Sequence, residues 1–144
     1  MKNFLFAAMT MLLIATTGCD KDDDNISTTV TAENVKNTVS AGTWRVAYYY
    51  DTDHEETADF AGYNFTFQAS GVVSAANDIL SRSGTWSAMN DSGKTKFVLD
   101  FATPADFEDI SEDWEVIALS ATEIQLRHVS GGGGGTDLLT FSKN

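Results

Sequence analysis

Large apolar side chains recur at every second residue in three segments of this chain, residues 44–50, 63–67 and 97–101. A period of two places consecutive side chains on opposite faces of an extended strand, so that one face is apolar and the other polar. Strands with one buried face are typical of antiparallel sheets. The alternation therefore predicts an all-β fold, in which the apolar faces form a common core.

Turn residues divide the rest of the chain into further short strands. Ser70-Gly71 and Asn90-Asp91-Ser92-Gly93 are turn signals, and the five glycines 131–135 form a hairpin loop. We expect eight strands, at residues 44–50, 63–68, 72–76, 84–89, 96–101, 114–119, 123–129 and 137–142. Closing this antiparallel meander into a barrel removes the exposed edges that promote aggregation. An open sandwich is the alternative.

Two short helices are expected beside the strands. Residues 31–39 begin with the capping residue Thr31 and carry Val35 and Val39 on one face. Thr103-Pro104-Ala105-Asp106 is typical of a second helix start. We expect this second helix to lie across a mouth of the barrel.

Residues 1–18 have the three parts of an export signal. Lys2 supplies a positive charge, residues 4–15 are apolar, and small residues precede Cys19. The apolar stretch of about a dozen residues is shorter than the ~20 that a membrane-spanning helix requires. Cys19 is the only cysteine of the chain, and it follows the small residues directly. We expect cleavage before Cys19 and attachment of lipid to it.

The charged run Asp20-Lys21-Asp22-Asp23-Asp24 follows, and residues 19–30 are interpreted as a flexible acidic tether to a barrel domain of residues 31–144. The formal net charge of −12 argues against nucleic-acid binding. No second cysteine is present for a disulfide, so the stability of the domain must come from hydrophobic packing.

Thr16-Thr17-Gly18-Cys19 resembles the lipobox of bacterial lipoproteins, in which signal peptidase II cleaves before a diacylated cysteine. Thr16 stands where the family usually has leucine. Lys21-Asp22-Asp23 resembles the signal that sends lipoproteins of the Bacteroidetes type to the outer face of the outer membrane. The resemblance implies a lipid anchor in the outer membrane, with the periplasmic and outer faces both open.

Gly42-Thr43-Trp44 opens the first predicted strand after a helix, where lipocalins carry their Gly-x-Trp motif, and Gly84-Thr85-Trp86 repeats it. Residues 113–116 and 138–143 also resemble the lipocalin-like domains of Bacteroidetes-type lipoproteins. The Thr-Asp-Tyr motif of lipocalins is missing. Arg127 is the candidate for the basic residue that lipocalins place over the tryptophan. The resemblance implies an eight-stranded lipocalin-like barrel.

An eight-stranded barrel is wide enough either to hold one small ligand or to be filled by its own side chains. Our leading hypothesis is a carrier of a small apolar or amphipathic molecule. The residues expected to line its interior are Tyr48, Tyr50, Phe65, Phe67, Phe97, Leu99 and Phe101. The alternative is a filled barrel that displays an exposed Tyr49, the acidic loop 51–59 and the glycine loop to an envelope protein or a glycan. We expect a monomer without a cofactor.

The sequence carries little catalytic chemistry. His54 and His128 are the only histidines, neither has a metal-ligand spacing, and no Gly-x-Ser-x-Gly motif occurs. We therefore expect no enzyme. One acidic group has oxygen ligands suitable for calcium, although a solvated helix face is the favoured interpretation. It consists of Asp106, Glu108, Asp109, Glu112 and Asp113.

Overall fold

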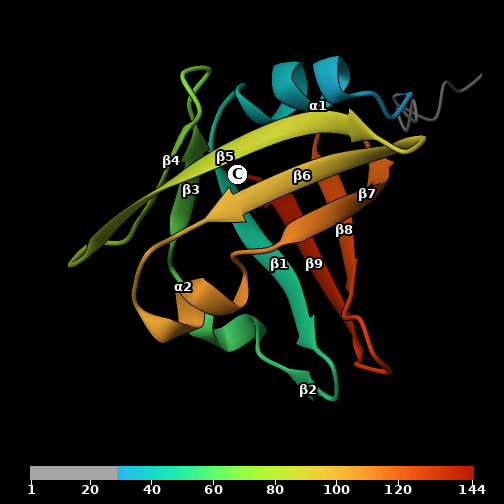
Figure 1. Ribbon diagram of the computed structural model, residues 1–144. Coiled ribbons are helices and arrows are strands. Elements are labelled where there is room, and N and C mark those ends of the chain that lie inside the picture. Colours follow the sequence, from blue (N-terminus) through green and yellow to red (C-terminus); the bar gives the residue numbers. More distant parts are fainter. Residues whose placement is uncertain (1–28) are drawn as a thin grey trace, which may run out of the picture.

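The computed structural model describes residues 29–144, and the predicted signal peptide, Cys19 and tether residues 20–28 lie outside the described residues. The chain folds into a closed antiparallel barrel of eight strands with one extra short strand (Figure 1). The strands are β1 (Trp44–Asp51), β2 (His54–Glu55), β3 (Asn64–Phe67), β4 (Val72–Ala76), β5 (Ser81–Asp91), β6 (Lys94–Asp100), β7 (Asp113–Leu119), β8 (Glu123–Val129) and β9 (Thr136–Lys143). The predicted barrel is confirmed.

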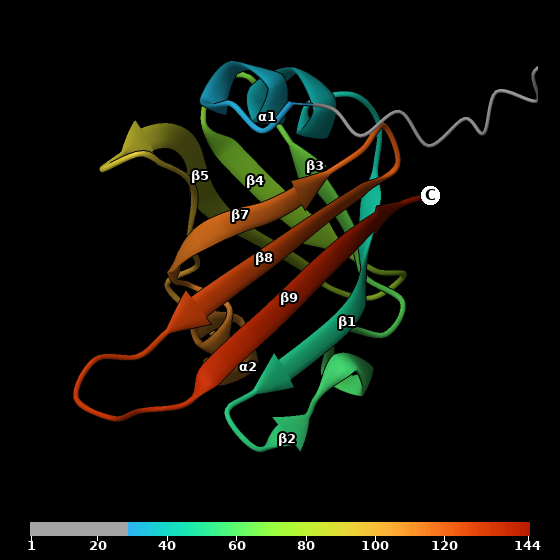
Figure 2. The ribbon, with the colours of Figure 1, turned by 90° about the vertical axis from the view of Figure 1, so that its right-hand side faces the viewer.

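Closure of the barrel depends on the pairing of the first and last long strands. β9 pairs with β1 from Trp44 opposite Lys143 to Tyr50 opposite Leu138. Figure 2 shows these two strands side by side with β8. The contact between β1 and β3 is much shorter, with Trp44 opposite Phe65 as its one strand pairing. Beyond it, the Thr57 hydroxyl accepts a hydrogen bond from the Tyr49 amide at 2.8 Å. A side chain thus replaces a strand partner here.

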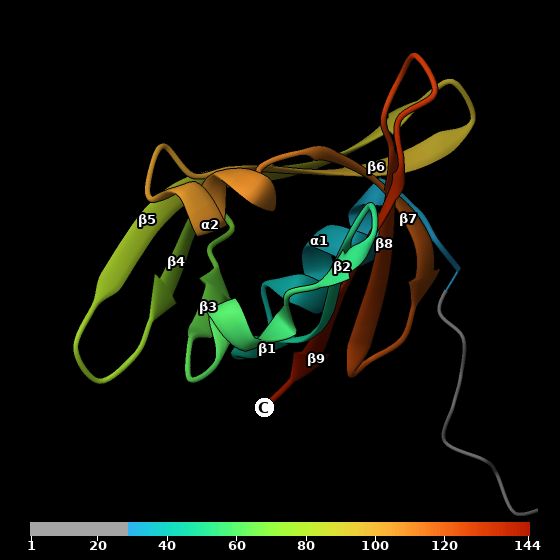
Figure 3. The ribbon, with the colours of Figure 1, turned by 90° about the horizontal axis from the view of Figure 1, so that it is seen from below.

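The helix α1 (Ala32–Val39) covers one end of the barrel, while α2 (Ala105–Asp109) and the 3₁₀ helix η1 (Thr57–Phe60) lie at the other end (Figures 1 and 3). The predicted cap of α1 is confirmed, because the Thr31 hydroxyl accepts from the Asn34 amide at 3.1 Å. Val35 and Val39 are fully buried. Among residues 29–144, no helix is both long and apolar enough to cross a membrane.

Two local predictions were wrong. The pattern predicts a second helix that is capped by Thr103 and begins at Pro104, but the helix begins one residue later, at Ala105, with Pro104 at the cap position. The acidic loop 51–59 contains β2 and most of η1. A two-residue strand and a single 3₁₀ turn are too short to produce a periodic sequence pattern.

Two tryptophans hold the two helices at the ends of the barrel. The indole N–H of Trp44 donates to the Val39 carbonyl at 2.9 Å, which holds the end of α1. The indole N–H of Trp114 donates to the Ile110 carbonyl at 3.0 Å, which holds the end of α2. Both rings are fully buried, so each indole needs such an acceptor.

The basic residue over Trp44 is Lys143, whose Nζ lies 5.6 Å from the ring centroid. Arg127, the residue predicted for this role, instead pairs with Glu115 on the outer face at 3.0 Å. The prediction was wrong because Arg127 and Trp44 face opposite sides of the barrel wall. The last strand, which pairs directly with β1, brings Lys143 to the tryptophan.

Gly84 provides a test of this packing. A Cβ at residue 84 would overlap the Asp100 carbonyl oxygen and lie 2.9 Å from the Phe101 ring. We therefore expect Gly84→Ala to lower the free energy of unfolding by about 1–3 kcal/mol, as overpacking does. The measurement is the midpoint of urea denaturation. Gly131→Ala is the matched control, since a Cβ there meets nothing within 4 Å, and equal midpoints for the two variants would contradict the packing.

Candidate functional site

Five of the seven residues expected to line a ligand cavity do face the barrel interior. Phe65, Phe67, Phe97, Leu99 and Phe101 are each at most 2% exposed. They contact one another rather than surrounding an open space. The ring centroids of Phe65 and Phe101 are 6.3 Å apart, and those of Phe67 and Phe97 are 5.4 Å apart. Aromatic side chains therefore fill the middle of the barrel.

The other two predicted lining residues, Tyr48 and Tyr50, do not face the interior. A β-bulge shifts the register between Val46 and Tyr48 and reverses the alternation of the strand from that point. Tyr48 is 39% exposed, whereas Tyr49, predicted to be exposed, is 1% exposed. The Tyr49 hydroxyl donates to the Asp109 carbonyl at 3.1 Å and so supports α2. Burial, with nearby negative charge, raises the pKa of Tyr49.

The acidic residues considered for calcium do not assemble into a ligand set. Within residues 29–144, no group of three or more His, Cys, Asp or Glu side chains is placed to hold a metal ion. The α2 end is nevertheless crowded with carboxylates. Burial, followed by the charge of Asp51, raises the pKa of both Asp109 and Glu56. This end of the barrel therefore disfavours anions.

The two histidines lie apart, each beside carboxylates. His54 is exposed beside Asp53, and His128 lies between Asp137 at 3.3 Å and Glu112 at 3.7 Å. Neither is hydrogen-bonded to a serine, threonine or tyrosine hydroxyl among residues 29–144.

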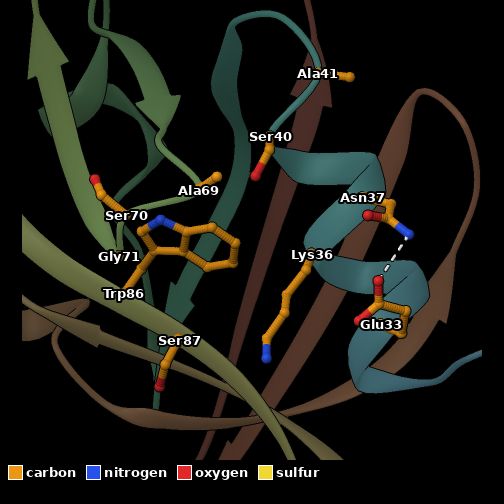
Figure 4. Close-up of a pocket in the computed structure, with 10 residues that line it drawn as sticks. All are labelled: Glu33, Lys36, Asn37, Ser40, Ala41, Ala69, Ser70, Gly71, Trp86 and Ser87. Carbon is orange, nitrogen blue, oxygen red and sulfur yellow. Dashed lines mark hydrogen bonds between the residues drawn. The ribbon is translucent and has the colours of Figure 1, made fainter.

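A cleft of about 520 Å³ lies outside the barrel, between α1, the turn that joins β3 to β4, and β5 (Figure 4). We call it the α1 cleft. Its lining residues are Glu33, Lys36, Asn37, Ser40, Ala41, Ala69, Ser70, Gly71, Trp86 and Ser87. Its volume lies within the range of roughly 300–1,000 Å³ that is typical of small-molecule sites.

Trp86 separates the α1 cleft from the barrel interior. Its ring contacts Phe67 and Phe97 on the interior side, at centroid distances of 5.5 and 5.6 Å. Figure 4 shows the indole facing into the cleft. Its N–H already donates to the Gln68 carbonyl at 2.9 Å. The indole therefore offers the cleft an apolar ring rather than a free donor.

Lys36 provides the cationic group of the α1 cleft. Its side chain extends from α1 toward Trp86 and Ser87 (Figure 4). Among residues 29–144, no carboxylate lies within 4.0 Å of its Nζ, although Lys94, Lys96 and Arg127 each form such an ion pair. The carboxylate of Glu33, one turn earlier, accepts a hydrogen bond from Asn37 at 3.3 Å. The cleft thus combines an aromatic surface with an ammonium group that has no ion-pair partner in the described chain.

A second, smaller hollow of about 280 Å³ lies on the outer face of β6, β7 and β8. Its charged groups mostly pair with one another. Glu115 accepts hydrogen bonds from Lys94 at 2.9 Å and Arg127 at 3.0 Å, and these bonds hold its pKa below the usual range. We interpret this hollow as an ion-pair network and assign it no ligand.

The sequence pattern did not indicate the α1 cleft. Trp86 has the strand position of a core residue, and Lys36 has the position of a solvated helix residue. Both descriptions are locally correct, since Trp86 is 6% exposed and Lys36 is exposed. Only the packing of α1 against β5, which are separated by more than forty residues in the chain, brings them together.

No family model matches the chain, and no curated protein matches it. Among solved structures, it is similar to the crystal structure of a DUF4847 family protein from Bacteroides vulgatus ATCC 8482, with a TM-score of 0.53 and 19% sequence identity. The likeness covers 76% of this chain and 97% of that chain. At this level of identity it shows a shared fold, a small antiparallel β-barrel.

Proposed function

We propose that this chain is a lipid-anchored lipoprotein of the bacterial cell envelope that binds a small amphipathic molecule in the α1 cleft. Its lipocalin-like barrel serves as a rigid, filled support, and the ligand site lies on the outside. The role is one of binding rather than catalysis, and it involves no nucleic acid.

The proposal rests on the contrast between the packed interior of the barrel and the open α1 cleft. The interior, where a lipocalin-like carrier would hold its ligand, is packed with phenylalanine rings 5.1–6.5 Å apart around Phe65. The α1 cleft, in contrast, has about 520 Å³ of space next to the Trp86 ring. Ligand sites are concave and mostly apolar, with a few polar groups that fix orientation. The α1 cleft is concave and has Trp86, Ala41 and Ala69 as apolar lining, beside the polar side chains of Glu33, Lys36, Asn37, Ser40, Ser70 and Ser87.

The lining of the α1 cleft also indicates which ligand it favours. An apolar or aromatic portion would lie against Trp86, where burial of apolar surface stabilises binding. A negatively charged group would pair with Lys36, which has no competing ion pair among the described residues. Hydroxyls of Ser40, Ser70 and Ser87 line the same cleft and can complete the hydrogen bonding. The crowded carboxylates near α2 lie at the opposite end of the barrel, and the one carboxylate that lines the cleft, that of Glu33, accepts a hydrogen bond from Asn37.

The proposed anchor places this cleft near the membrane. Residue 29 leads directly into α1, which forms one wall of the cleft. Nine residues, and so ten residue-to-residue steps, lie between Cys19 and Thr29, and a fully extended chain spans about 3.3–3.6 Å per step. The α1 end would thus stay within roughly 35 Å of the lipid attachment point. An amphipathic ligand that partitions into the membrane surface would be within reach.

A second candidate role is contact with another envelope protein. The turn between β4 and β5 presents Ile79, which is 88% exposed, and Leu80, which is 43% exposed. The side-chain oxygen of Asn77 accepts from both of their amides, at 3.0 and 2.7 Å. The turn is therefore held in one conformation with two aliphatic side chains in solvent, as an anchor for a partner's apolar pocket would require.

A matched pair of probes tests the cleft. We expect indole-3-acetate to bind the purified domain more tightly than neutral indole-3-acetamide and to shift the Trp86 indole N–H resonance in NMR titrations. Lys36→Met should weaken indole-3-acetate binding about threefold, the size expected for an exposed ion pair. The same variant should leave indole-3-acetamide binding unchanged. Lys96→Met, in the second hollow, serves as the control and should change neither.

Two results would count against the cleft. If neither probe shifts the Trp86 resonance at millimolar concentration, the cleft is not a site for small amphipathic molecules. If both probes bind the wild-type domain equally, Lys36 does not select for negative charge.

The anchor is tested separately in intact bacteria. We expect the full chain to incorporate an alkyne-labelled fatty acid and to fractionate with the outer membrane, because two or more acyl chains give stable anchoring. Cys19→Ala should lose the label and appear in the soluble fraction. Ser27→Ala, in the same tether, is the matched control. Membrane association of the Cys19→Ala protein equal to wild type would exclude the lipid anchor.

A further inference from the structure

The β-bulge in β1 places two tyrosine rings on the outer wall of the barrel. Strict alternation from Val46 would turn Tyr48 inward, but the register shift turns Tyr48 outward and Tyr49 inward. The rings of Tyr48 and Tyr50 are parallel within 7°, with centroids 6.4 Å apart. Tyr48 is 39% exposed, and Tyr50 is half-buried. Bulges commonly re-aim side chains next to functional sites.

The strand register defines what surrounds these rings. Tyr48 lies opposite Thr140 of β9, which in turn lies opposite Gln125 of β8. Tyr50 lies opposite Leu138, which lies opposite Arg127. Figure 2 shows β1, β9 and β8 as neighbouring strands of one wall. The two rings are thus followed across the sheet by a hydroxyl, an amide and a guanidinium group. We call this surface the tyrosine face.

We propose that the tyrosine face binds a neutral glycan chain. A sugar ring has an apolar C–H face and a rim of hydroxyls, so it needs a flat apolar surface with hydrogen-bonding groups beside it. Tyrosine rings provide rigid, amphipathic contact area at a low cost in conformational entropy. Two parallel rings on successive outward positions of one strand supply this surface to neighbouring sugars. Thr140 supplies a hydroxyl beside the rings, and Gln125 supplies its amide oxygen, while its N–H donates to Glu123 and Arg127 stays paired with Glu115.

A protein partner fits this surface less well. A stable protein–protein interface buries roughly 800 Å² on each partner around an apolar core. The cross-strand neighbours of the two rings are polar, apart from the half-buried Leu138. Glu55 of β2 lies opposite Tyr50 on the other side of β1, and its carboxylate can accept hydrogen bonds from sugar hydroxyls. No carboxylate lies opposite either tyrosine in β9.

The tyrosine face is separate from the α1 cleft, because its residues lie on β1, β9 and β8 and none of them lines the cleft. The inference therefore does not depend on the ligand proposed for the cleft.

Isothermal titration of the purified domain with cellohexaose, xylohexaose and maltohexaose tests the assignment. We expect saturable binding of at least one of these neutral oligosaccharides. Tyr48→Ala and Tyr50→Ala should each weaken it about tenfold, the size expected for loss of one aromatic contact. Tyr48→Phe keeps the ring and should retain most of the affinity. Met89→Ala removes another exposed apolar side chain, on β5, and should have no effect.

Three outcomes would overturn the proposal. The first is that none of the three oligosaccharides binds at millimolar concentration. The second is binding that Tyr48→Ala and Tyr50→Ala leave unchanged while circular dichroism shows both variants to be folded. The third is self-association of the wild-type domain in sedimentation that Tyr48→Ala abolishes, which would identify the tyrosine face as a protein interface.

Discussion

Ring packing around Phe65 is the interaction on which the rest of the molecule depends. Its ring lies within 6.5 Å of the rings of Phe67, Phe101, Phe107 and Phe141, which come from β3 itself, the end of β6, α2 and β9. These rings join opposite walls of the barrel and attach α2 to its lower end. Burial of each such side chain contributes about 1.5–3 kcal/mol. In a described chain without cysteine, this packing replaces the disulfides that stabilise many small exported domains.

A filled interior changes where function can lie. A barrel wide enough for one ligand has used that space for its own side chains, so the binding sites that we propose lie on the outer surface. Trp86 shows the consequence most clearly. Its inner side packs on Phe67 and Phe97, and its other side forms part of the α1 cleft. The same residue thus completes the core and supplies the apolar surface of the proposed site. Rigid support of this kind holds recognition groups in position without a cost in ordering.

The fold was predictable from the sequence because alternation is a strong local signal. All eight barrel strands and α1 with its Thr31 cap were predicted, since each is specified by residues close together in the chain. The bulge at Ala47 was not, because an inserted residue leaves no mark in the run of Tyr48, Tyr49 and Tyr50. One extra residue moves every side chain that follows it to the opposite face of the strand. Alternation therefore predicted Tyr48 and Tyr50 inside the barrel and Tyr49 outside, which is the reverse of the observed arrangement.

The candidate site was less predictable than the fold for a related reason. Lys36 and Trp86 belong to elements that are far apart in the chain and meet in the folded barrel, and neither residue has an unusual local pattern. The same holds for Lys143 over Trp44, which depends on the pairing of the last strand with the first. Contacts between distant segments are set by packing, and a single sequence does not contain them as a period or a motif.

The most direct test of this account is a crystal structure of the domain under xenon pressure. Xenon enters empty apolar cavities in proteins and leaves filled ones unoccupied. We predict no xenon among Phe65, Phe67, Phe97 and Phe101, because their rings already occupy that space. An ordered xenon atom between these rings would show a cavity inside the barrel, and it would return the ligand site to the interior.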